Sequence, residues 1–93
     1  MRIAGYIDHP TLKITIFQLE NKFIVKFESG LFELAFKFRT GGPINNVDDI
    51  YRLADDAFIE AAIEQMNTMR RIHTAALERL NPMEEEDEFE EII

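Results

Sequence analysis

The chain has 93 residues, a net charge of −8 and no cysteine. A chain of this length forms one domain with a modest core, and the lack of thiols excludes disulfides and thiolate metal sites. We expect a cytoplasmic protein, because residues 1–10 carry no apolar run of signal-peptide length and no segment is long and apolar enough to span a membrane.

The acidity is concentrated at the C-terminal end. Residues 84–91 hold seven acids and no base, whereas residues 1–83 hold eleven acids and ten bases. A nearly neutral body without a basic stripe argues against nucleic-acid binding. We therefore divide the chain into a single domain over residues 1–82 and an acidic tail over residues 83–93.

Alternating apolar and polar residues predict an antiparallel β-meander of three or four strands, over about residues 2–7, 12–19, 22–28 and 31–39. Gly5 weakens the first of these, so its place in the sheet stays open. Two-residue loops at Glu20-Asn21 and Ser29-Gly30 would fix the register. The predicted facing pairs are Ile14–Phe27, Ile16–Val25, Phe27–Phe32, Val25–Leu34 and Phe23–Phe36, with the charged pairs Lys13–Glu28 and Lys26–Glu33.

One face of this meander is continuously apolar and the other is mostly polar. On the polar face Phe17, Ile24 and Ala35 would line up across the strands. Scattered apolar side chains are normal on a protein surface. The alternative interpretation is a second contact patch.

Apolar residues spaced about 100° apart predict one long amphipathic helix over residues 47–80. Asn46 is a suitable N-cap, Asp49 nearly completes a capping box, and Pro82 marks the end. Such a helix measures about 51 Å and the longest strand about 26 Å, so half of the helix would extend beyond the sheet. Either it breaks near Met66-Asn67-Thr68, or a second copy covers it.

The width of the apolar stripe, nearly twice what packing on a sheet requires, favours the second copy. Residues 46–64 carry six acids and one base, and residues 65–80 carry one acid and three bases. Two antiparallel helices crossing near residues 66–68 would pair these blocks. The alternative is a charge gradient that follows the helix macrodipole. The candidate dimer interface consists of Met66, Met69, Ile72, His73, Leu77 and Leu80.

Chemical motifs are weak. The glycine-rich connection between Thr40 and Asn46 lacks a phosphate-binding fingerprint, although a small ligand or a simple active site in a groove near it stays an alternative. Asp56, Glu60 and Glu64 share a helical face and are typical of solvated acids rather than metal ligands. We name no catalytic, cofactor-binding or metal-binding residue.

The tail has two interpretations. A run of like charge predicts a flexible segment, whereas Phe89, Ile92 and Ile93 are candidate anchors for a partner with a basic rim. The tail would then act on a protein partner, or as an acidic mimic that inhibits a basic site. Taken together, the sequence predicts an α+β domain that serves as a small, non-catalytic interaction or regulatory module and forms a homodimer through its long helix.

Overall fold

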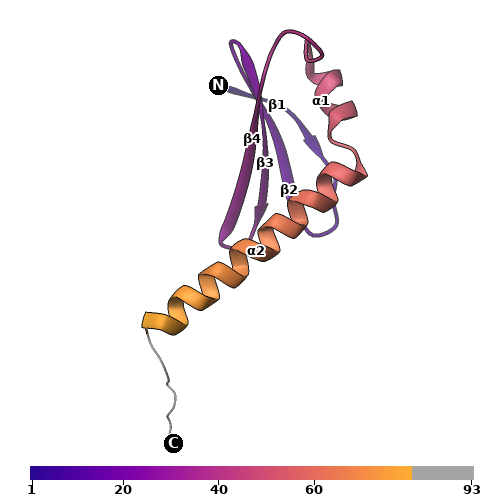
Figure 1. The fold of residues 1–93 in the computed structure, drawn as a ribbon. Coiled ribbons are helices and arrows are strands. Elements are labelled where there is room, and N and C mark those ends of the chain that lie inside the picture. Colours follow the sequence, from indigo (N-terminus) through magenta and orange to yellow (C-terminus); the bar gives the residue numbers. More distant parts are fainter. Residues whose placement is uncertain (81–93) are drawn as a thin grey trace, which may run out of the picture.

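The computed structural model describes residues 1–80 and has one four-stranded antiparallel sheet with two helices on one face (Figure 1). The strands are β1 (Arg2–Ile7), β2 (Lys13–Leu19), β3 (Lys22–Ser29) and β4 (Phe32–Arg39), paired in that order. The helices are α1 (Val47–Leu53) and α2 (Asp56–Leu80). This confirms the predicted α+β meander followed by a long helix. The acidic tail lies outside the described residues.

The first strand belongs to the sheet, and Gly5 has a role in it. β1 pairs with β2 through a register shift between Ile3 and Gly5, as a β-bulge produces. The Tyr51 ring of α1 lies directly over Gly5, where a Cβ atom would collide with its hydroxyl group. That hydroxyl donates to the carbonyl oxygen of Tyr6, 3.3 Å away. Gly5 therefore allows α1 to sit close to the edge strand.

The register of β2 on β3 is the predicted one. Lys13 faces Glu28, Ile14 faces Phe27 and Ile16 faces Val25. Leu19 and Lys22 close the pairing, so Glu20 and Asn21 form the two-residue loop. The alternation of apolar and polar residues and the two-residue loop together specify this pairing.

The predicted register of β3 on β4 is wrong by two residues. Phe23 faces Phe38, Val25 faces Phe36 and Phe27 faces Leu34. The reason lies in the loop: Gly30, with φ of 58°, is its first residue and Leu31 its second, exposed at the tip. Glycine suits the positive φ of a two-residue hairpin loop at either position. The prediction places Gly30 second, after Ser29, whereas in the structure it is first.

This correction changes partners but not faces. A shift of two residues leaves each side chain on the same side of the sheet. Lys26 therefore faces Ala35 rather than Glu33, and Glu33 faces Glu28. Ala35 no longer lines up with Phe17 and Ile24, because Lys37 occupies that place.

The helical region is broken, but not where the sequence suggested. α2 runs without interruption through Met66-Asn67-Thr68, whereas the chain leaves helical geometry at Ala54 (φ −84°, ψ 62°) and changes direction before α2 (Figure 1). Asp55 then starts α2, since its carboxylate accepts from the amide of Phe58 at 2.9 Å. Because α1 and α2 use different faces to cover the sheet, the break also accounts for part of the wide apolar stripe.

The core lies between the sheet and the helices. Phe58 of α2 packs its ring against three phenylalanines of β3 and β4, with centroid distances of 5.7 Å to Phe27, 5.0 Å to Phe36 and 6.2 Å to Phe38. Around this aromatic group the fully buried side chains are those of Ile14, Ile16, Phe23, Val25 and Ile50. Each such side chain contributes about 1.5–3 kcal/mol of transfer free energy, so the helix and the sheet depend on each other for stability.

The second half of α2 extends past the sheet. His73 packs edge-on against Phe32 at the start of β4, with ring centroids 5.3 Å apart. The residues after it, 74–80, project beyond the sheet (Figure 1); we call them the α2 overhang. Within residues 1–80 neither helix is long and apolar enough to cross a membrane.

Candidate functional site

The predicted dimer interface divides into a buried part and an exposed part. Met66 is only 3% exposed and belongs to the core, and Met69 is half-buried against it. His73 contacts Phe32 with its ring but is itself exposed. The remaining three apolar side chains are open to solvent: Ile72 is 62% exposed, Leu77 55% and Leu80 82%.

Leu77 and Leu80 continue the face of α2 that contacts the sheet. At 100° per residue, Leu77 lies about 20° around the helix from Met66 and Leu80 about 40°. Ile72 lies further round, at about 120° from Met66. The overhang therefore presents the same stripe that the sheet covers along the first half of the helix. Leu77 and Leu80 also line a shallow surface hollow together with Thr74 and Glu78.

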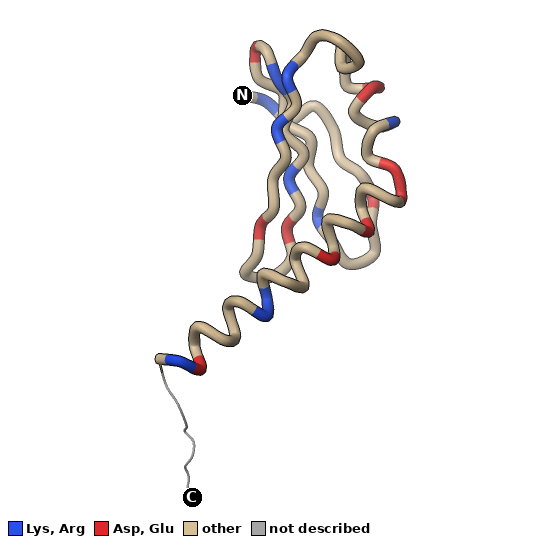
Figure 2. The backbone as a smooth tube through the Cα atoms, viewed as in Figure 1, with Lys and Arg blue, Asp and Glu red and all other residues tan. Residues whose placement is uncertain are grey.

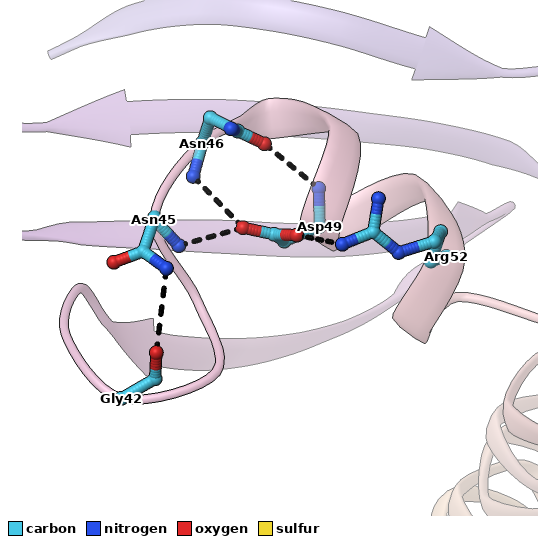
Figure 3. Close-up of polar contacts among 5 residues, drawn as sticks. All are labelled: Gly42, Asn45, Asn46, Asp49 and Arg52. Atoms are coloured by element: carbon cyan, nitrogen blue, oxygen red, sulfur yellow. Dashed lines mark hydrogen bonds and ion pairs between the residues drawn. The ribbon is translucent and has the colours of Figure 1, made fainter.

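The connection between Thr40 and Asn46 leads into α1 and caps its N-terminus. Gly41 and Ile44 exchange backbone hydrogen bonds of 2.7 and 3.2 Å. The Asp49 carboxylate accepts from the amides of Asn45 at 2.8 Å and Asn46 at 3.2 Å, and the Asn46 side chain accepts from the amide of Asp49 at 3.1 Å (Figure 3). These reciprocal bonds are a capping box.

The same contacts set the charge state of Asp49. The amide of Asn45, then that of Asn46 and the guanidinium of Arg52, hold the pKa of Asp49 below its usual value of 3.8, against the opposing effect of desolvation. The side chain of Asn45 in turn donates to the carbonyl oxygen of Gly42 at 3.3 Å (Figure 3). The polar groups that suggested a ligand groove are therefore bound to one another at the helix N-terminus.

The acids of α2 do not converge on a common point. Asp55 caps the helix, and the part of the chain that the structure describes has no group of three or more His, Asp or Glu side chains arranged to hold a metal ion.

A third surface is the polar face of the meander, for which a second contact patch was one of the two interpretations. The side of the sheet that faces away from α1 and α2, which we call the outer face, collects the side chains at alternating strand positions. Phe17 and Ile24 face each other there, and the Lys26 ammonium lies 5.3 Å from the centre of the Phe17 ring. The sequence predicted Lys13 and Lys26 on this face, but not the grouping of Lys22, Lys37 and Arg39, because these bases are separated along the chain and come together only across strands.

Thr15 lies in the middle of the outer face between Tyr6 and Lys26. Its side chain is 2% exposed, and its hydroxyl oxygen has no hydrogen-bond partner within residues 1–80. A buried hydroxyl without a partner costs stability.

No family model, curated protein or solved structure matches this chain at a significant level.

Proposed function

We propose that the protein is a small, non-catalytic interaction module that forms a homodimer through the α2 overhang. The observation that carries this proposal is the exposure of Leu77 and Leu80 on the face of α2 that the sheet covers earlier in the helix. An apolar helix face with no covering element is typical of an interface.

The position of the contact follows from burial. A crossing centred near residues 66–68 would require a partner to displace the sheet from Met66, which belongs to the core. A crossing within residues 72–80 requires no such displacement. Two antiparallel overhangs related by a two-fold axis would cover each other's Leu77 and Leu80, and a two-fold contact closes without leading to fibres.

The size of the contact limits its affinity. Seven residues of helix measure about 10 Å, so the buried area falls below that of standard, stable interfaces. We expect a dimer that dissociates in the micromolar range and is controlled by concentration. Such a module would respond to its own abundance or to a larger partner that binds the same stripe.

Light scattering at tens of micromolar, followed by dilution, tests the proposal. We expect a dimer for the native chain and a monomer for Leu77→Glu, because a carboxylate in the contact would be desolvated. The matched control is Ala75→Glu, which adds the same charge on the overhang about 160° around the helix from Leu77 and should leave the dimer intact. A native chain that is monomeric over this range refutes the proposal.

A further inference from the structure

Half of the chain's bases lie on the outer face of the sheet. The strand register places there the side chains of Lys13, Lys22, Lys26, Lys37 and Arg39, five of the ten bases, against the acids Glu28 and Glu33 alone. Both acids lie toward the 29–32 hairpin, and most of the bases lie toward the other end of β3 and β4 (Figure 2). No element of residues 1–80 covers this face.

Three of these bases form a cluster without a counter-charge. Lys22 directly faces Arg39 across the strands, and Lys37 lies two residues before Arg39 on the same face. Like charges that face each other destabilise a sheet. Among the described residues none of the three forms an ion pair, since Lys26–Glu28 and Asp49–Arg52 are the pairs present. We call Lys22, Lys37 and Arg39 the basic cluster; an acidic partner would relieve its repulsion.

The surroundings of the basic cluster are apolar. Ile24 faces Lys37 on one side and Phe17 on the other, and Leu19 faces Lys22. A surface that combines an apolar strip with unpaired bases fits a peptide that carries both acids and apolar anchors. A bare polyanion would leave the apolar strip unused.

The chain itself contains such a peptide. We propose that the outer face is the docking surface for the acidic C-terminal segment, residues 84–93, of the same molecule. Its acids are opposite in charge to the excess of three bases on the outer face, and Phe89, Ile92 and Ile93 complement the apolar strip beside them. The alternative for a run of like charge is that it stays in solvent.

The segment is long enough to reach the basic cluster. The thirteen residues after Leu80 span up to about 43 Å when extended. The path back from Leu80 to His73, beside the hairpin, is about 10 Å, and that from Phe32 along β4 to Lys37 is about 17 Å. Enough length remains to pass around the sheet. A tether of this length also gives a high effective concentration, which favours docking within the molecule over docking onto a chain that is not bound to it.

A spin label on the outer face tests the proposal in the full-length chain. The chain has no cysteine, so Ala35→Cys provides a single attachment site on the outer face, opposite Lys26. We expect the amide signals of residues 84–93 to lose most of their intensity with this label. A label at Asp48→Cys, exposed on α1 on the other side of the sheet, should leave them strong. Equal intensities with the two labels refute docking.

Charge reversal identifies the contact. Changing Lys22, Lys37 and Arg39 together to Glu should restore the intensities with the Ala35→Cys label, whereas changing Arg70, Arg71 and Arg79 to Glu should not. The amide signals of residues 2–39 verify that each variant is folded. If the triple variant does not fold, Lys37→Glu alone replaces it, and we then expect a partial restoration of the tail intensities. Restoration by the α2 control would overturn the assignment to the basic cluster.

A mixed sample separates docking within a chain from docking between chains. It combines a labelled chain without ¹⁵N and a ¹⁵N chain without label, so that only contacts between chains reduce the signals. We expect full intensities in this sample. A loss of the tail signals would place the tail of one copy on the sheet of another and overturn the proposal.

Discussion

The substitution Glu33→Lys reports directly on the register of β3 and β4. In the structure Glu33 faces Glu28, so a lysine at position 33 replaces repulsion by attraction. Cross-strand charge pairs contribute roughly 0.2–1 kcal/mol, and both positions are at least partly exposed. We therefore expect the free energy of unfolding to rise by about 0.5 kcal/mol, which corresponds to about 2–4 °C in the melting temperature. Thermal and urea unfolding at low salt measure it.

The opposite sign would refute this register. If Lys26 faced Glu33, the same substitution would set two lysines opposite each other and destabilise the protein. A double-mutant cycle with Glu28→Gln isolates the interaction energy between positions 28 and 33. In 1 M salt this energy should nearly vanish, because the Debye length falls to about 3 Å. Glu20→Lys, in the β2–β3 loop, is the matched control for the change in net charge. Destabilisation by Glu33→Lys that disappears in a Lys26→Gln background would contradict the structure.

Three further predictions concern the buried Thr15 of the outer face, the contrast between core and overhang, and the cap of α1. Thr15→Val should raise the free energy of unfolding by about 1 kcal/mol in urea, because it removes a buried hydroxyl without a partner; a loss would mean that the hydroxyl is bonded. Met66→Ala should lower the free energy of unfolding by about 2–5 kcal/mol. Leu77→Ala, measured in dilute monomer, should change it by less than about 0.5 kcal/mol. Equal costs for the two variants would contradict the exposure of the overhang. Because the pKa of Asp49 is lowered in the folded state, its contribution to stability is complete above the usual value of 3.8 and is lost as the pH falls through the folded-state pKa. Urea unfolding of Asp49→Asn should therefore show a weaker loss of stability below about pH 4 than the native chain.

The sheet was predictable where two independent signals agreed. For β2 and β3 the alternation of Ile14, Ile16, Val25 and Phe27 and the two-residue loop led to the same register. For the pairing of β3 with β4, the alternation and the loop did not discriminate between the predicted register and the observed one, which differ by two residues. The apolar alternation is unchanged by a shift of two residues, and the apparent match of Lys26 with Glu33 favoured the wrong alternative. A charge pair worth a few tenths of a kcal/mol is outweighed by loop geometry, which Gly30 determines.

The break between the helices was hidden by continuous apolar spacing. Ala54, Ala57 and Phe58 continue the helical pattern, so periodicity alone shows no interruption. The available signal was Asp55 followed by Asp56, an N-cap and a first-turn acid. The overhang was predictable from length alone, since both the predicted helix of about 51 Å and the observed one of 25 residues, about 38 Å, are longer than a strand of eight residues, about 26 Å. The sequence could not predict that Met66 belongs to the core while Met69 is only half-buried, because both sides of the stripe are apolar.

The strictly sequential order of the strands also bears on how fast the domain folds. Each strand pairs with the next along the chain, and the loops of the second and third hairpins have two residues each. Closing such short loops costs little chain entropy, and folding rates rise as contacting residues become closer in sequence. The meander can therefore form by successive zipping from either hairpin, with Phe58 arriving afterwards to close the core. We expect the folding of this β-rich domain to be faster than that of sandwiches of similar size, whose strands must pair across long loops.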